Sequence, residues 1–205
     1  MRETGEQQEN ILEVRDLQLA FLGVNGRVEA LRGVNLAVTA GEIVALVGES
    51  GSGKTALCRA VLGLHANHAV IEHGGIWLAG QDTSTLTEKD WCALRGRVAS
   101  MVFQDPMTAL DPTMTIGAQI AEAVLAHRPK LEKSAVRARV IELLELVGID
   151  RAQERMALYP HNFSGGMRQR VVLAIALAGD PRILFADEPT TALDVTIQAQ
   201  ILDLL

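Results

Sequence analysis

A glycine-rich loop between an apolar run and a helix-forming segment constrains this chain more than any other feature. Residues 48–55 read GESGSGKT and fit the pattern G-x-x-x-x-G-K-[ST] in full. The short apolar run at 43–47 predicts a strand buried on both faces, and residues 56–64 predict a helix. This strand–loop–helix context is the one in which the pattern binds phosphate. The sequence therefore predicts an α/β fold built around a phosphate-binding loop.

The residue types of the loop fit the chemistry of holding a polyphosphate. Glycines let backbone N–H groups point inward at phosphate oxygens, and the start of the following helix adds partial positive charge. Lys54 suits the β- and γ-phosphates, and the Thr55 hydroxyl suits Mg²⁺. The alternative is a glycine-rich turn that only joins strand to helix. The expected nucleotide contacts in the loop are Gly48, Ser50, Gly51, Ser52, Gly53, Lys54 and Thr55.

A second apolar segment ends in two acidic residues. Residues 183–186 are apolar, and Asp187 and Glu188 follow them. In an open α/β sheet the carboxyl end of such a strand faces the ligand crevice. Asp187 suits the Mg²⁺ shell, and Glu188 suits orienting or deprotonating a water molecule that attacks the γ-phosphate. The alternative is that both acids cap or solvate the turn before Pro189.

The rest of the chain alternates strand and helix patterns, with one purely helical stretch. Residues 1–10 are polar and predict a flexible tail, whereas residues 11–38 predict two strands joined by a turn. Residues 113–160 carry no strand signal, and apolar residues in 134–147 recur at steps of three and four. We therefore expect a mostly parallel sheet with an N-terminal antiparallel β part and an inserted helical subdomain at about 105–162.

The remaining expected elements are shorter. Strands are predicted at 76–80 and 98–103, and helices at 87–94, 115–126, 165–178 and 194–204. Thr87 and Ser164 are the expected N-caps of two of these helices.

Composition excludes several classes of function. The 205 residues include 19 basic and 25 acidic side chains, and this net charge of −6 argues against nucleic-acid binding. The longest apolar run, 171–178, is far shorter than the roughly 20 residues that span a bilayer. The polar N-terminus is not typical of a secretory signal, so a reducing cytoplasm is expected. The two cysteines lack metal-site spacing, and His65, His68 and His73 are interpreted as solvated loop residues.

A third motif connects these sites to a known family. Residues 163–170, FSGGMRQR, resemble the signature motif of ATP-binding cassette (ABC) ATPases. Residues 103–123 and 159–201 resemble the ATPase subunits of bacterial oligopeptide, dipeptide and nickel importers, although glutathione and phosphonate-metabolism relatives share these stretches. The resemblance runs from about residue 11 to residue 205, and it implies a P-loop NTPase fold.

The resemblance implies further site residues. Phe21 matches the aromatic residue that stacks on adenine, and the alternative is an ordinary core residue at a strand end. Gln104 matches the glutamine that touches Mg²⁺ or the attacking water and couples to the membrane partner. The residues that match contacts to ATP on the opposite subunit are Ser164, Gly165, Gly166 and Asp194. For the first three, an N-capped helix is the alternative.

The resemblance also implies a function and partners. We expect an ATPase subunit that uses ATP and Mg²⁺, pairs with a second ABC ATPase subunit and drives transmembrane permease subunits. It would lie at the cytoplasmic face of the inner or plasma membrane and power import of peptides or nickel. The alternatives are a soluble ABC ATPase, as in DNA repair, and an accessory subunit of a non-transport complex, as in phosphonate metabolism.

The chain departs from the family pattern in two places. Asn162 stands where many of these importers have Glu. The family also continues beyond residue 205 with a strand whose histidine contacts the γ-phosphate, and that strand lies between residues 43–47 and 182–187. We therefore expect the domain at 11–205 to be C-terminally truncated, with those two strands lacking a shared neighbour. Alone, this chain would hydrolyse ATP weakly or not at all.

Overall fold

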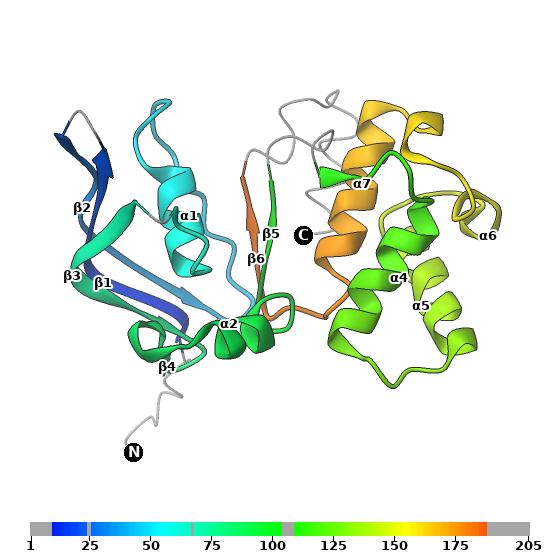
Figure 1. Cartoon of the computed structure of the whole chain (residues 1–205), viewed down its shortest axis with the longest axis horizontal. Helices are drawn as coiled ribbons and strands as arrows, with labels where there is room; N and C mark the ends of the chain where they lie inside the picture. Colours follow the sequence, from blue (N-terminus) through cyan, green and yellow to red (C-terminus); the bar gives the residue numbers. More distant parts are fainter. Residues whose placement is uncertain (1–9, 24–25, 67, 104–108, 188–205) are drawn as a thin grey trace, which may run out of the picture. The chain divides into compact units, whose positions relative to one another are not determined.

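The computed structural model describes residues 10–23, 26–66, 68–103 and 109–187 and contains two units, residues 1–98 and 99–205 (Figure 1). Antiparallel strands dominate the first unit, and the second combines helices with a parallel strand pair. The α/β class predicted from the sequence is therefore confirmed.

An antiparallel sheet with strand order β2-β1-β3-β4 forms the first unit's framework. Its strands are β1 (Asn10–Gly23), β2 (Gly26–Thr39), β3 (Ala69–Leu78) and β4 (Gln81–Asp82). β1 lies between β2 and β3 and pairs antiparallel with both, so the predicted pair of strands over 11–38 is confirmed. The buried apolar residues that β1 contributes are Ile11, Leu12, Val14, Leu17, Leu19 and Ala20.

A shared irregularity explains why β3 is longer than predicted. The pairing of β1 shifts register after Val14 against β2 and after Arg15 against β3. At this bulge Asp16 has φ +45°, and Gly74 in β3 has φ +78°. A Cβ at Gly74 would lie 2.2 Å from the Asp16 carbonyl oxygen, so only glycine fits. The strand predicted to begin at residue 76 therefore begins at Ala69, and Gly74 and Gly75 lie inside it.

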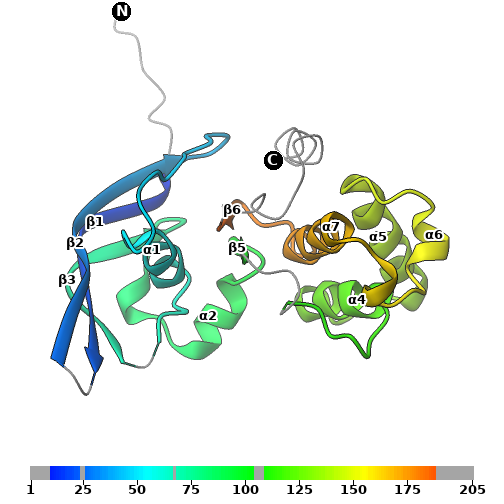
Figure 2. The same ribbon diagram turned by 90° about the horizontal axis from the view of Figure 1, so that it is seen from above.

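Two short helices complete the described part of the first unit (Figure 2). α1 (Lys54–Val61) packs against β2 and buries Leu57 and Val61. α2 (Glu88–Leu94) follows the 3₁₀ turn Thr83–Thr85. Its N-cap is Thr87, as predicted: the Asp90 N–H donates to the Thr87 hydroxyl, and the Thr87 N–H donates back to the Asp90 carboxylate at 2.9 Å.

The segment before the glycine-rich loop differs from its prediction. Residues 43–47 form no strand, and the side chains of Ile43 and Val47 are 81% and 94% exposed. A strand persists only where a neighbour accepts and donates its backbone hydrogen bonds, and none of the described strands pairs with this segment. The prediction of a strand buried on both faces is therefore wrong for the structure of this chain.

A parallel strand pair opens and closes the described part of the second unit. β5 (Ala99–Val102) and β6 (Ile183–Ala186) pair in register from Ala99 opposite Ile183 to Val102 opposite Ala186. Both strands were predicted, and within the described residues they form the parallel part of the fold. β6 has β5 as its single partner among the strands that the structure describes.

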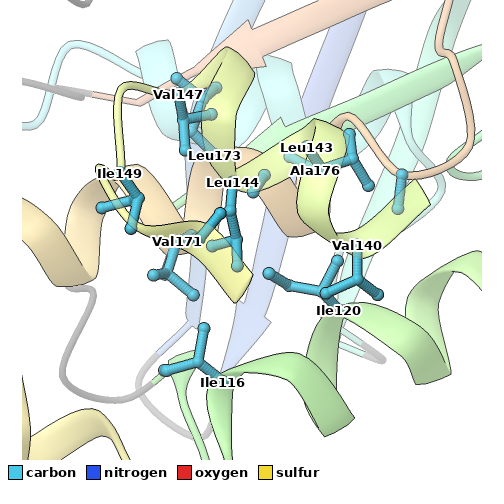
Figure 3. Close-up of a cluster of buried hydrophobic side chains, with 14 of the residues drawn as sticks. Ile116, Ile120, Val140, Leu143, Leu144, Val147, Ile149, Val171, Leu173 and Ala176 are labelled. Carbon is cyan, nitrogen blue, oxygen red and sulfur yellow. The ribbon is translucent and has the colours of Figure 1, made fainter. Parts of the chain in front are cut away.

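Helices between these strands share one apolar core (Figure 3). They are α4 (Ile116–His127), α5 (Lys133–Leu146), α6 (Ala152–Arg155) and α7 (Gly165–Ala176). Core side chains labelled in Figure 3 are Ile116, Ile120, Val140, Leu143, Leu144, Val147, Ile149, Val171, Leu173 and Ala176. The apolar positions that recur at helical spacing in 134–147 all belong to this core, so that prediction of a helix is confirmed.

Two further predictions concern membrane-spanning helices and the two ends of the chain. None of the helices described is long and apolar enough to cross a membrane. Residues 1–9 of the expected tail and the expected helix at 194–204 lie outside the described residues, and β1 already begins at Asn10.

Candidate functional site

The glycine-rich loop closes around the side chain of Lys54. The Lys54 ammonium donates hydrogen bonds to the carbonyl oxygens of Gly48 at 2.8 Å and Glu49 at 2.9 Å. The Ser52 N–H donates to the same Glu49 carbonyl at 3.2 Å. Gly51, with φ +81°, adopts a backbone conformation that side chains disfavour. Two carbonyl groups of the loop therefore fix the position of the Lys54 ammonium.

Gly53 seats the loop on the sheet. Its φ is +96°, and a Cβ there would lie 2.7 Å from the Ala30 carbonyl oxygen and 2.9 Å from the Leu31 side chain. α1 begins at the next residue, and the Leu57 N–H donates to the Gly53 carbonyl at 2.8 Å. Close packing of Gly53 on β2 therefore fixes where the helix N-terminus and Thr55 stand.

The loop has the donors that an anionic ligand needs. Among the described residues, no backbone carbonyl or side chain accepts a hydrogen bond from the N–H of Gly51, Gly53 or Lys54. Ser50 and Ser52 are exposed beside them. Unpaired N–H groups at a helix N-terminus, next to a lysine ammonium, match the charge and donor pattern of phosphate. These residues therefore fit a nucleotide polyphosphate.

Phe21 lies near the end of β1, in the same unit as the loop. Its register partners are Val28 in β2 and Ala69 in β3. The side chain is half-buried, and its ring lies 5.5 Å from the His68 ring, centroid to centroid, at an angle of 44°. Phe21 is therefore not one of the fully enclosed core residues of the first unit.

Asp187 marks the carboxyl end of the parallel strand pair. Its N–H donates to the Val102 carbonyl at 3.0 Å, which extends the pairing of β6 with β5 by one step. The residue is half-buried. Because the strands are parallel, their carboxyl ends meet at one edge, where ligands bind in open α/β sheets. The other residues expected near this edge or at the subunit interface, Gln104, Glu188 and Asp194, lie outside the described residues.

The segment at 162–166 leads from the 3₁₀ turn Pro160–Asn162 into the first turn of α7. The Ser164 hydroxyl accepts a hydrogen bond from the Met167 N–H at 3.3 Å, so Ser164 is the N-cap, as predicted. Gly165 is exposed, and a Cβ there would meet no atom within 4 Å; Gly166 is half-buried. The Asn162 side chain accepts from the Tyr159 N–H at 3.0 Å, so it stabilises the turn before the helix.

Tertiary contacts that have no sequence signal hold these segments in place. Arg95, next to α2, donates to the carbonyl oxygens of Leu62 and Gly63 at 2.9 Å each, and so caps the C-terminus of α1. In the second unit, Arg170 of α7 donates to the Gly148 carbonyl at 2.9 Å, just after α5. Sequence reasoning assigned nothing to either arginine, because their partners are distant along the chain.

Two of the three histidines differ from their interpretation as solvated loop residues, whereas His68 is exposed in the turn before β3, as predicted. His73 lies within β3, exposed, where its Nε2 is 3.1 Å from the Asp16 carboxylate. His65 is half-buried, and its Nδ1 is buried without a partner among the described residues. His68 is exposed and in ring contact with Phe21.

Comparison with known proteins bears on both units. A protein-family model described as ABC transporter matches residues 31–191. The chain is 50% identical over 198 residues to the dipeptide transport ATP-binding protein DppD of Lactococcus lactis subsp. cremoris, covering 97% of this chain and 57% of that protein. It is 51% identical over 196 residues to the oligopeptide transport ATP-binding protein OppD of Bacillus subtilis, covering 95% and 54%. The chain thus spans about half the length of these curated relatives.

Solved structures show the same fold. The ATP-binding cassette MJ0796, in a dimeric post-hydrolysis state bound to ADP and Pi, matches with a TM-score of 0.83 and 27% identity, over 94% of this chain and 80% of that one. CbiO1 from Clostridium perfringens, part of an ABC transporter complex, matches with a TM-score of 0.79 and 27% identity, over 96% and 72%.

Proposed function

This chain belongs to the ABC transporter family, and we propose that it is the ATP-binding and ATP-hydrolysing subunit of a peptide importer. The observation that carries the proposal is the loop at 48–55, where the Lys54 ammonium is bound to two loop carbonyls and the N–H groups of Gly51, Gly53 and Lys54 have no acceptor among the described residues. Relatives about half identical to the chain are named for dipeptide and oligopeptide transport, which supports a peptide cargo.

Residues of the first unit would bind ATP. The N–H groups of the loop would take the phosphate oxygens, together with the Lys54 ammonium, which would exchange its carbonyl partners for stronger, charge-assisted bonds. Phe21 would stack its ring on adenine, because its half-buried position leaves part of the ring accessible. The loop contacts are Gly48, Ser50, Gly51, Ser52, Gly53, Lys54 and Thr55.

Hydrolysis needs groups at the carboxyl end of β6 as well. Thr55, Gln104 and Asp187 offer the oxygen ligands that Mg²⁺ prefers. When bound, Mg²⁺ would neutralise charge on the β- and γ-phosphates. Glu188, which follows Asp187 in the sequence, would accept a proton from the attacking water or orient it.

A second ATPase subunit would complete the site. Dimeric cassettes among the similar structures support this pairing. Ser164, Gly165, Gly166 and Asp194 would contact ATP held by the opposite subunit, where the open surroundings of Gly165 allow close backbone approach. Transmembrane permease subunits would bind the ATPase pair at the cytoplasmic face of the membrane. The net charge of −6 and the relatives' names both oppose a nucleic-acid function.

The decisive experiment replaces the proposed base. In the protein as the cell makes it, Glu188→Gln should retain ATP binding and lose hydrolysis, because the amide keeps the shape of the side chain but cannot take a proton. The ATP-bound dimer should persist on size-exclusion chromatography with ATP and Mg²⁺. Turnover at the wild-type rate would show that Glu188 is not the base, and absence of ATP binding by the wild-type protein would contradict the proposed function itself.

A further inference from the structure

The backbone pairing of the sheet brings the side chains of Phe21 and His68 together. His68 immediately precedes β3, and the Leu22 N–H of β1 donates to its carbonyl oxygen at 2.7 Å. The next residue, Ala69, is the register partner of Phe21. The backbone therefore brings the two rings to 5.5 Å, tilted by 44°, in the range favourable for aromatic pairs.

This pair lies at the end of the sheet that carries the glycine-rich loop. Phe21 is opposite Val28 in β2, and Ala30 is two residues further along that strand. Two strand residues span about 7 Å. A Cβ at Gly53 would touch the Ala30 carbonyl, so the end of the loop, where α1 begins, lies close to this point. Phe21 and His68 therefore lie in the same unit as the phosphate-binding residues, and Phe21 is on the strand next to β2, which Gly53 contacts.

Phe21 needs support to act as a stacking platform. Its half-buried ring has Val28 as its β2 partner, and that side chain is 65% exposed, so β2 gives it little enclosure. A ring that changes rotamer freely would lose conformational entropy on binding a base. The His68 imidazole restricts those rotamers from the β3 side.

We propose that His68 is a positioning residue for nucleotide recognition, which orients the Phe21 ring for stacking on the base of ATP. The inference rests on the proposed function, because it presumes that ATP binds at the loop. Because His68 acts through Phe21, its replacement should weaken the binding of the base and leave the binding of the phosphates unchanged.

The test is a set of variants of the protein as the cell makes it, titrated by calorimetry with ATP and with base-free tripolyphosphate. His68→Ala keeps the backbone hydrogen bond to Leu22 and removes only the ring. It should weaken ATP binding roughly two- to tenfold, the change expected for one aromatic pair, and leave tripolyphosphate binding unchanged. His68→Phe should restore ATP affinity. His73→Ala, an exposed histidine on the neighbouring β3, should have no effect on either ligand.

A double-mutant cycle separates positioning from general damage. In a Phe21→Ala background, His68→Ala should cost nothing further. Equal losses for ATP and tripolyphosphate, additive losses in the cycle, or tighter ATP binding by His68→Ala would each overturn the inference while leaving the proposed function intact. Wild-type protein that binds neither ligand would overturn both.

Discussion

The Lys54 ammonium and the Gly48 carbonyl oxygen are 2.8 Å apart, so a cation and the loop that surrounds it are joined by a direct hydrogen bond. The same ammonium also donates a hydrogen bond to the Glu49 carbonyl at 2.9 Å. Carbonyl groups are weaker partners for an ammonium than phosphate oxygens are. The carbonyl groups therefore position the Lys54 ammonium, and phosphate oxygens of a bound nucleotide would replace them as its hydrogen-bond partners.

Lys54→Ala should weaken ATP binding by roughly ten- to a hundredfold, the range expected for losing a hydrogen bond to a charged group. Calorimetric titration of the protein with ATP measures this directly. Lys89→Ala, which removes the same charge from an exposed position on α2, is the matched control and should bind ATP like the wild type. Unchanged affinity in Lys54→Ala would contradict the assignment of the loop.

Replacement by alanine should reduce stability and ATP binding at Gly53 but leave both unchanged at Gly165. Gly53→Ala places a Cβ 2.7 Å from the Ala30 carbonyl at φ +96°, so α1 must shift on β2. The left-handed conformation alone costs about 1–2 kcal/mol, and we expect lower stability together with loss of ATP binding. Gly165→Ala meets open space, so the melting temperature and ATP binding should stay at wild-type values.

Gly165→Ala should nevertheless reduce ATP hydrolysis, because the proposed contact to ATP on the opposite subunit needs close backbone approach. Steady-state ATPase assays and thermal melts on both variants check the contrast. A Gly165→Ala protein with wild-type turnover would remove the support for that contact, and a fully stable, ATP-binding Gly53→Ala would refute the packing argument.

Most of the fold could be predicted from local patterns, because an N-cap or an amphipathic helix is determined by residues close together in the sequence. Thr87 and Ser164 were expected as N-caps from residue type and position, and each accepts a hydrogen bond from an N–H three residues on. The apolar stripe in α5 needed only helical periodicity to be recognised. The loop at 48–55 was likewise visible because all its residues are consecutive.

Features that depend on a distant partner were not predictable. Residues 43–47 have the hydrophobicity of a buried strand, but hydrophobicity does not say which strand pairs with them. The strand predicted at 76–80 begins at Ala69 instead, because Gly74 fits against Asp16 within β3. The contact of Arg95 with Leu62 joins residues 33 positions apart, and no local pattern marks it.

The helical core predicts a strong contrast between neighbouring leucines in α5. Leu144 is fully buried among the side chains of Figure 3, whereas Leu146 is 51% exposed. Leu144→Ala should lower the free energy of unfolding by about 2–5 kcal/mol, because it removes apolar contacts and leaves a cavity. Leu146→Ala should change it by less than about 0.5 kcal/mol. Urea denaturation followed by circular dichroism distinguishes the two, and equal effects would contradict the described core.

The capping box of α2 predicts a pH-dependent contribution to stability. The Thr87 hydroxyl donates to the Asp90 carboxylate at 2.6 Å and the Thr87 N–H donates to it at 2.9 Å, and these bonds lower the pKa of Asp90 below its ordinary value. A carboxyl group whose pKa is lower in the folded than in the unfolded state stabilises the fold above the unfolded pKa, about 3.9. That contribution is lost as the pH falls through the folded pKa.

Asp90→Asn should therefore be less stable than the wild type near neutral pH, and the difference should shrink as the pH falls below about 4, where the wild-type carboxyl group also becomes neutral. Hydrogen exchange of the α2 amides across this pH range measures the effect where it arises. Asp150→Asn, an exposed acid that accepts no hydrogen bond among the described residues, is the control and should alter α2 exchange at no pH. A difference between Asp90→Asn and wild type that stayed constant down to pH 3 would mean that the Thr87–Asp90 bonds do not depend on the charge of the carboxylate.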